Sequence, residues 1–333
     1  MITRRRFLQT FSAAGAAGAL GLGRRAFAAE PPPETSRIRI PRVENVCWAP
    51  AYIAGDLLRS EGFSDVQFVQ YPDPAKAYVG MAAGQVDIFM AFVAPTIQQI
   101  DAGNPLVVLG GVHPGCQELF ASAKIRSVQD LKGKTIAAGA PNDPGQLFTA
   151  AFLGHVGIDP QRDVKWVFAP VAERLAMLST GKIDAVLNGP PSAQEFRAKK
   201  VGHVIVNTTT DRPWSQYFCC MLTANRNFMH KHPVATKRAM RAILKASHVC
   251  ASDPEPVARQ LVKGGFATNF EYAHQALREI PYGRWRDYDA EDTVRYYSLR
   301  LKEAGFIKSS PKKIIADGTD WRFLNELKKE LKA

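Results

Sequence analysis

A short segment occurs twice in the chain, 97 residues apart. Residues 81–88 read MAAGQVDI and residues 178–185 read LSTGKIDA. In each copy a helical pattern ends at a glycine, Gly84 or Gly181, which suits the left-handed residue just beyond a helix. An aspartate then opens an apolar stretch of strand length. The repeat predicts two lobes that share one topology.

The rest of the pattern indicates an α/β fold. Between residue 37 and about residue 207, apolar runs of strand length alternate with helical patterns of ten to fifteen residues, which is typical of βαβ units with helices flanking mainly parallel sheets. Two extended stretches, 117–124 and 216–224, would carry the chain into the second lobe and back. Beyond residue 225 we expect helices at 233–250, 255–263, 270–279, 291–304 and 321–331, packed mostly on the first lobe.

These patterns predict a division into lobes. Lobe I would comprise residues 29–116 and 225–333, and lobe II residues 117–224 with both crossovers. The mature chain, about 305 residues, is also slightly long for one compact domain, which favours two lobes.

The N-terminus has the pattern of a twin-arginine export signal. Residues 3–9 read TRRRFLQ, a weakly apolar run spans 10–23, and Ala26-Phe27-Ala28 forms a small-residue cleavage site. The run is shorter than the roughly twenty residues that span a bilayer. We therefore expect residues 1–28 to be removed and the mature protein to act in the periplasm; the alternative is a basic N-terminus that carries these arginines by chance.

The net charge and the cysteine content limit which binding partners and which disulfides we expect. Residues 1–28 hold five arginines and no acidic residue, so the net charge falls from +12 to +7 in the mature chain. No dense Lys/Arg run interleaved with aromatics indicates nucleic-acid binding, and we expect a monomer. The odd number of cysteines lacks framework spacing, so most are expected to be buried thiols: Cys47, Cys116, Cys219, Cys220 and Cys250.

Four strand-to-helix junctions carry proline near the first helical position, where its missing N–H costs nothing. They are Ala49-Pro50, Ala94-Pro95, Asp143-Pro144 and Gly189-Pro190. Only Asp143 offers a side chain that caps a helix. The other three helix starts would leave N–H groups for water or for the oxygens of a ligand.

Helix ends alone cannot hold a ligand tightly. Each contributes about 0.3–1 kcal/mol to an anion, whereas micromolar binding requires about 8 kcal/mol. Burial of aromatic surface could supply the difference, and the same loops carry Trp48, Tyr52, Tyr71, Phe92, Trp214 and Tyr217. These side chains favour a flat ligand with one or two acceptor groups, unless they belong to the core.

The order and spacing of several motifs resemble a known family. The motifs are Ala49-Pro50-Ala51-Tyr52-Ile53-Ala54 and the segments 81–87, 131–137 and 181–186. The chain resembles the solute-binding proteins of nitrate, taurine, alkanesulfonate and thiamine-precursor ABC importers over nearly its whole mature length. The resemblance implies a two-lobed type II periplasmic-binding fold, a ligand between the lobes, and delivery to a membrane permease driven by a cytoplasmic ATPase.

The resemblance also implies which loops hold the ligand. Sulfonate and taurine binders tend to have Ser or Thr where this chain has Asn142-Asp143-Pro144-Gly145, which argues against a sulfonate. Two further candidates, His113 and Tyr217, come from their places after a strand and near the return crossover. The expected ligand-binding residues are Asn45, Cys47, Trp48, Tyr71, Phe92, Val93, Ala94, His113, Asn142, Asp143, Asn188, Gly189, Pro190 and Tyr217.

The sequence indicates no catalytic machinery. Lys132-Gly133-Lys134-Thr135 resembles the end of a phosphate-binding loop, but its first glycine position is Val128. The histidines and cysteines lack metal-ligand spacing, and no nucleophile, base and orienting group can be assigned. We therefore expect a binding protein, without cofactor or metal, for a small polar or anionic ligand; the candidates are aromatic carboxylates, pyrimidines and other small polar anions. Two alternatives stay open: an exported enzyme acting on a pyrimidine-like molecule, whose yeast-type relatives carry a cysteine-rich cluster faintly similar to residues 218–221, and a ligand-sensing subunit.

Overall fold

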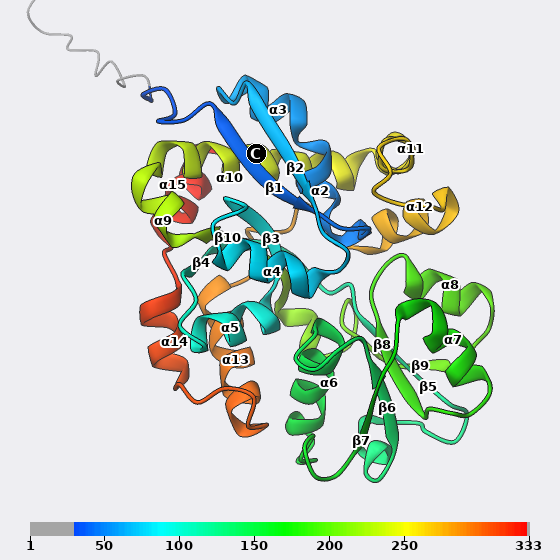
Figure 1. The fold of residues 1–333 in the computed structure, drawn as a ribbon. Coiled ribbons are helices and arrows are strands. Elements are labelled where there is room, and N and C mark those ends of the chain that lie inside the picture. The colour runs from blue at the N-terminus through cyan, green and yellow to red at the C-terminus, as the bar shows by residue number, and fades with distance from the viewer. Residues whose placement is uncertain (1–29, 332–333) are drawn as a thin grey trace, which may run out of the picture. The chain divides into compact units, whose positions relative to one another are not determined.

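The computed structural model describes residues 30–331, in which strands and helices alternate as far as Asn225 and helices follow (Figure 1). The export signal expected at residues 1–28 lies outside the described residues. From residue 33 onward the chain forms one compact unit. Among the described residues, no helix is long and apolar enough to cross a membrane.

The N-terminal region contains two sheets. Strands β1 and β2 pair in parallel, and β10 lies between β3 and β4, antiparallel to both. The strands are β1 (Arg37–Arg42), β2 (Asp65–Gln70), β3 (Ile88–Phe92), β4 (Leu106–Pro114) and β10 (Phe218–Asn225). The helices that follow these strands are α2 (Ala49–Ile53), α3 (Gly55–Ser60), α4 (Pro74–Ala82) and α5 (Val93–Asp101).

The central region contains one five-stranded sheet in the order β7-β6-β8-β5-β9. Its strands are β5 (Glu118–Ala121), β6 (Thr135–Ala138), β7 (Lys165–Phe168), β8 (Ala185–Asn188) and β9 (His203–Asn207). Its helices are α6 (Pro144–His155), α7 (Val171–Ser179) and α8 (Ser192–Ala198). The short 3-10 helices of the chain are η1 (Val46–Trp48), η2 (Val128–Leu131) and η3 (Trp214–Gln216).

The sheets are mixed, where mainly parallel pairing was expected. Strands β6, β7 and β8 pair in parallel, but β5 is antiparallel to β8 and β9, as β10 is to β3 and β4. Strand β5 enters the central sheet from the N-terminal region, and β10 enters an N-terminal sheet from the central region. Each is antiparallel to the strands on both of its sides. Strand β5 begins and β10 ends close to the predicted boundaries at 117 and 224; the division into two lobes stays a prediction.

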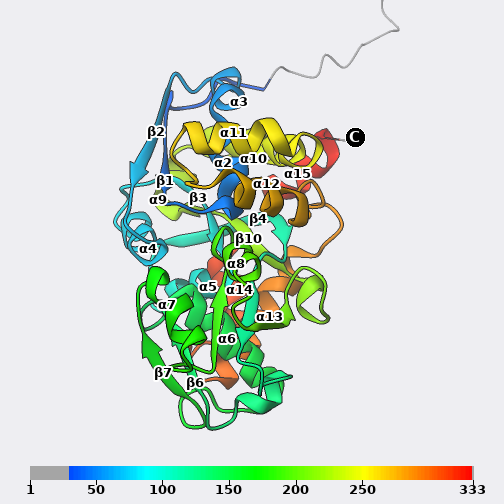
Figure 2. The same ribbon diagram turned by 90° about the vertical axis from the view of Figure 1, so that its right-hand side faces the viewer.

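After Asn225 the chain is helical, as predicted. The helices are α9 (Arg226–Lys231), α10 (Pro233–Ser252), α11 (Pro254–Lys263), α12 (Phe270–Glu279), α13 (Ala290–Glu303), α14 (Pro311–Gly318) and α15 (Arg322–Glu330). Helices α9 and α14 were not predicted. Helix α10 packs on α2 and α3, and α14 packs on α5, but α12 and α13 also contact α8 and α6 of the central region (Figure 2).

The repeated segment has the same structure in both copies. Gly84 and Gly181 adopt left-handed φ angles of 70° and 72°, as predicted. The aspartate of each copy then accepts a hydrogen bond from the backbone of another strand. Asp87 Oδ2 accepts the N–H of Arg39 in β1 at 2.8 Å, and Asp184 Oδ2 accepts the N–H of Thr135 in β6 at 2.9 Å. The repeat therefore fixes one helix end and one strand start in each region.

Candidate functional site

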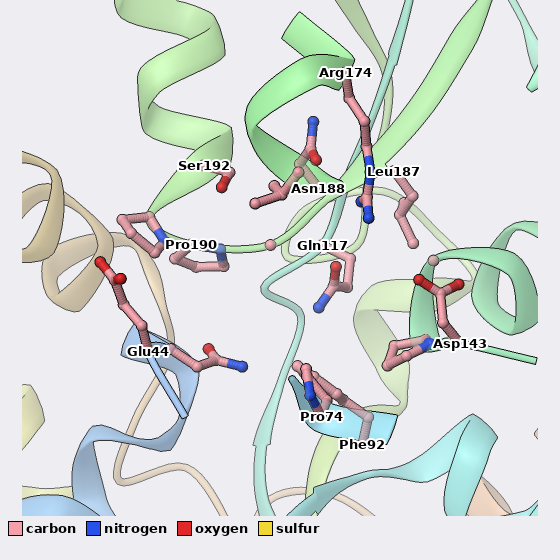
Figure 3. A pocket seen from close by; sticks show the side chains of 16 residues that line it. Glu44, Pro74, Phe92, Gln117, Asp143, Arg174, Leu187, Asn188, Pro190 and Ser192 are labelled. Carbon is pink, nitrogen blue, oxygen red and sulfur yellow. The ribbon is translucent and has the colours of Figure 1, made fainter. Parts of the chain in front are cut away.

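A cleft of about 200 Å³ lies between the N-terminal and central regions (Figure 3). It lies beyond the carboxyl ends of β1, β3 and β8, where α/β sheets bind ligands. Its volume is below the roughly 300–1,000 Å³ of pockets for drug-sized ligands, which favours a small solute. Its lining residues are Glu44, Asn45, Pro74, Phe92, Gln117, Asp143, Pro144, Gly145, Val171, Arg174, Leu187, Asn188, Gly189, Pro190, Pro191 and Ser192.

Arg174 on α7 brings a positive charge to the cleft, with its guanidinium extended between Asn188 and Leu187 (Figure 3). Its Nε donates to the carbonyl of Ala169 at 2.9 Å, which fixes the side chain. Burial lowers the pKa of Arg174 and the nearby carboxylate of Asp143 opposes that effect; a guanidinium nevertheless stays protonated in proteins. Within residues 30–331, its terminal nitrogens make no hydrogen bond or ion pair, so they can bind a ligand.

Asp143 caps helix α6, as predicted. Its Oδ1 accepts the N–H of Gln146 at 2.8 Å and its Oδ2 accepts that of Gly139 at 2.7 Å. Burial raises the pKa of Asp143, although the two backbone N–H groups and Arg174 act in the other direction. The carboxylate therefore holds the loop after β6 in shape and stands beside Arg174 as a partial counter-charge.

Asn188 and Gln117 are two of the residues that bring a side-chain amide to the cleft. Asn188, at the end of β8, is 3% exposed, and its Nδ2 has no hydrogen-bond partner among the described residues. Gln117 lies where the chain passes from β4 to β5, and a Cβ on Gly189 would lie 2.9 Å from its Nε2. A glycine at 189 thus allows Gln117 to lie against the loop after β8. An unpaired buried donor is costly, so Asn188 is suited to a ligand with an acceptor group.

The predicted site residues divide into two groups. Asn45, Phe92, Asp143, Asn188, Gly189 and Pro190 line the cleft. The others do not line it: Cys47, Trp48, Val93, Ala94, His113, Tyr71, Asn142 and Tyr217.

The residues outside the cleft have structural partners or face solvent. Cys47, Trp48, Val93, Ala94 and His113 are at most 1% exposed and belong to the core. The rings of Trp48 and Phe89 lie 4.7 Å apart, and His113 contacts the carbonyls of Cys47 and Pro114.

The other three lie nearer the surface. The hydroxyl of Tyr71 donates to Gln85 Oε1 at 3.1 Å, and Tyr217 stacks on Tyr296. Asn142 is exposed with a φ angle of 64°. Because Trp214 and Tyr52 are also buried, in contact with Phe152 and Phe266, Phe92 is the one aromatic side chain among the residues that line the cleft.

Three helices begin without a side-chain cap, as the sequence predicts for their strand-to-helix junctions. No side chain caps α2, α5 or α8, although α5 begins at Val93 and α8 at Ser192, displaced from the predicted Ala94-Pro95 and Gly189-Pro190. Phe92, the residue before α5, instead uses its carbonyl to accept from Tyr78 and Thr96.

Arg174, the main cation of the cleft, is not among the residues predicted from the sequence. A signal was present: Ala169-Pro170 directly precedes α7 and is, like Asp73-Pro74 before α4, a further proline at a strand-to-helix junction. Its direction could not be predicted, because a residue four positions into a helix can face the cleft or solvent. Glu44 and Ser192, also missed, stand beside predicted residues at the cleft's outer side, where a further hollow shares them.

One buried group could hold a metal ion. His113, Cys116 and Cys220 offer ligand atoms that lie within 4.8 Å of one another. All five cysteines are buried free thiols, as expected for most of them.

A family model matches most of the chain. The model of the NMT1-like family matches residues 31–263. The chain belongs to this family. Among curated relatives, this NMT1-like protein is 28% identical over 136 residues to the nitrate/nitrite binding protein NrtA of Synechococcus elongatus, a match that covers 39% of this chain and 30% of the relative. The chain thus spans less than a third of that relative's length.

Solved structures show the same fold. The periplasmic nitrate-binding protein NrtA from Synechocystis PCC 6803 superposes with a TM-score of 0.74 at 15% identity, covering 91% of this chain and 90% of the other. The alkanesulfonate-binding protein SsuA from Xanthomonas axonopodis pv. citri, bound to MOPS, gives a TM-score of 0.66 at 16% identity, with 85% and 96% covered. The expected periplasmic-binding fold of the NMT1-like chain is confirmed, and these relatives are named as binding proteins.

Proposed function

We propose that this NMT1-like chain is the solute-binding component of an ABC importer and holds a small solute with one acceptor-rich group, such as an oxyanion or a carboxylate. The observation that carries the proposal is a pair of donors in the cleft that have no hydrogen-bond partner among residues 30–331: the terminal nitrogens of Arg174 and the buried amide nitrogen of Asn188. Planar guanidinium groups bind oxyanions and carboxylates through two parallel hydrogen bonds.

The charges around the cleft limit the solute to a low charge. Asp143 lies close enough to Arg174 for the two charges to affect each other's pKa, so the inner cleft is not strongly positive. Glu44, on the opposite wall, is exposed and accepts two hydrogen bonds from Thr268. A solute with several negative charges would meet both carboxylates, whereas a single acceptor group can face Arg174 and Asn188.

The relatives are consistent with such a solute. Their names specify nitrate or nitrite and alkanesulfonates, all of which present oxygen acceptors. For this chain, the small volume favours a compact solute. Of the aromatic residues named from the sequence, Phe92 alone lines the cleft, which removes most of the argument for a large flat solute.

Binding would couple to movement of the two predicted lobes. Residues of both regions line the cleft, and the chain passes between the regions near Gln117 and near Tyr217. A solute that contacts both walls would stabilise the closed arrangement by a hinge motion at these crossings. A membrane permease would then recognise the closed form. Periplasmic location, export by the twin-arginine route and a monomeric state are parts of this proposal.

The proposal can be tested before the solute is identified. Native mass spectrometry of freshly purified protein should detect a co-purifying molecule. Thermal unfolding with nitrate, bicarbonate, sulfonates and short carboxylic acids should then show a raised midpoint for the true solute, since a ligand at 100 times its Kd adds about 2.7 kcal/mol of stability. Conversion of a bound compound into a product would contradict a pure binding role and favour the enzyme alternative. A signalling defect in surface variants that still support uptake would favour the sensor.

A further inference from the structure

Four thiols and one imidazole gather in the core beside the two crossings between the regions. The group consists of Cys47, Cys116, Cys219, Cys220 and His113, and all five residues are buried. None of them lines the cleft. Cys116 stands just before Gln117, where the chain leaves β4 for β5, and Cys219 lies in β10, where the chain returns. These two cysteines therefore belong to different crossings.

The sulfur atoms of Cys116 and Cys219 lie 2.9 Å apart, although the residues are 103 positions apart in the sequence. A disulfide requires about 2.05 Å, so the two atoms need to approach by less than about 1 Å. Two thiolates on one zinc ion, each at about 2.3 Å from the metal in a tetrahedron, would lie about 3.8 Å apart. The distance therefore favours a bond between these two sulfurs over one metal ion shared by them; the group that could hold a metal ion contains Cys220 in place of Cys219.

Irregular backbone directs both side chains toward this contact. Cys116 has a φ angle of 104° in the left-handed region, where non-glycine residues are strained, and it follows Gly115 at 67°. Such strain persists where the surroundings enforce it and is concentrated at functional positions. On the other crossing, the β10–β4 register shifts between Phe218 and Cys220, and bulges of this kind redirect side chains.

We propose that Cys116 and Cys219 form a reversible disulfide that ties the two crossings together beneath the ligand cleft. The oxidant is a disulfide, either a low-molecular-weight one or that of a thiol oxidoreductase; its presence rests on the proposed location outside the cytoplasm. The thiolate of one of these two cysteines attacks one sulfur of the oxidant and expels the first thiolate. The second cysteine, once deprotonated, then attacks the sulfur of the resulting mixed disulfide that belongs to the protein and expels the second thiolate. Two cysteine thiols are oxidised, one external disulfide becomes two thiols, and the two cysteine protons pass to the released thiolates.

The bond would act on the cleft through Gln117. Its Nε2 lies 3.5 Å from the Cys116 sulfur and 3.9 Å from that of Cys219, and the same side chain lines the cleft. Oxidation would fix the backbone on both sides of the hinge and the position of this amide. A tied hinge exchanges less readily between open and closed arrangements, so the oxidised protein should release its solute more slowly.

The test measures pairing of thiols in the full chain. The protein is unfolded and reduced, then refolded in a buffer of reduced and oxidised glutathione, because both sulfurs are buried in the native protein. After denaturation, three of the five cysteines should react with iodoacetamide, and peptide mapping should join Cys116 to Cys219. The midpoint of thermal unfolding should rise by several degrees on oxidation and return on reduction.

Matched variants separate this pair from the other thiols. Cys250→Ser, which changes a buried cysteine of α10 outside the group, should keep the Cys116–Cys219 bond. Cys116→Ser and Cys219→Ser should each lose it and the redox-dependent midpoint, while circular dichroism shows that they fold.

Five reactive cysteines in the refolded wild type, a bond between a different pair, or thiols protected by a metal ion that a chelator removes would each overturn the proposal. Because no solute takes part in the thiol measurement, its failure would leave the solute-binding proposal standing. That proposal is tested separately by the thermal shifts with small acids.

Discussion

Arg197 on α8 pairs with Glu279 at the end of α12, with 2.5 Å between Nη2 and Oε2. The same guanidinium reaches Glu118 on the crossing strand β5 at 3.1 Å, and Gln194 donates to Glu279 as well. One arginine thus joins the central region, the crossing and the C-terminal helices. It lies outside the cleft, so its effect on binding would be exerted through the arrangement of the regions.

Replacing Arg197 by Ala should destabilise the protein, because it leaves two neighbouring carboxylates without their cation. Removal of one partner from a fully buried pair costs about 3–5 kcal/mol. Here the side chains of Arg197 and Glu279 are about one-third exposed, so we expect about 1–2 kcal/mol in urea unfolding. Arg197→Lys should recover part of the loss. Equal stability of wild type and Arg197→Ala would show that the pair contributes nothing to folding.

Glu118 makes the stability depend on pH. Burial raises its pKa to about 7, an effect opposed by Arg197 and increased by Glu279. In the unfolded chain the group ionises near 4.5, so between about pH 4.5 and 7 the unfolded state binds fewer protons than the folded state. The free energy of unfolding therefore falls as pH rises through this window.

Glu118→Gln should remove this contribution and flatten the pH profile of stability. Each pKa unit corresponds to about 1.4 kcal/mol. Between pH 4.5 and pH 8, the free energy of unfolding of the variant should therefore rise relative to that of wild type by on the order of 1–3 kcal/mol. Urea unfolding at both pH values measures the difference. Glu195→Gln, on the more exposed side of α8, serves as control and should leave the profile unchanged. If the pH profiles of stability of Glu118→Gln and wild type were parallel, Glu118 would not be the source of the pH dependence.

Arg174 should control solute binding and contribute little to folding. Hydrogen bonds to a charged group are worth about 1.5–3 kcal/mol, so Arg174→Ala should raise the Kd of the solute found by thermal shift about 10- to 100-fold. Arg174→Lys keeps the positive charge but lacks the planar guanidinium, so its Kd should lie between those of wild type and Arg174→Ala. Arg162→Ala removes an exposed arginine that pairs with Asp159 and should bind like wild type. Calorimetry that gives one Kd for all four proteins would remove Arg174 from the site.

Trp48 should behave as a core residue, in contrast to its predicted role in the cleft. It is 1% exposed and packs against Phe89 and Phe92. Trp48→Ala would leave a cavity, and losses of about 3–5 kcal/mol are usual for such substitutions. Val79→Ala, at a position that is 60% exposed, should change stability by less than about 0.5 kcal/mol. A Trp48→Ala protein of normal stability but weakened binding would restore the sequence-based interpretation.

The sequence by itself determined the features that depend on neighbouring residues. Alternating strand and helix patterns, the two glycines that end helices at 84 and 181, and the Asp143 cap are all local, because backbone geometry and capping involve residues a few positions apart. The rule that ligands bind beyond strand ends then placed Phe92, Asp143 and Asn188 at the cleft.

Only the tertiary structure decided which side chains of those loops face the cleft. Trp48 and Phe92 are both large and apolar and both lie near strand ends, yet Phe92 lines the cleft whereas Trp48 is buried against Phe89 and Phe92 of β3. Arg174 turns inward because the carbonyl of Ala169 holds it. Cys116 and Cys219 meet because two crossings far apart in sequence lie side by side. Burial and pairing of this kind depend on contacts between distant segments, which no local pattern specifies.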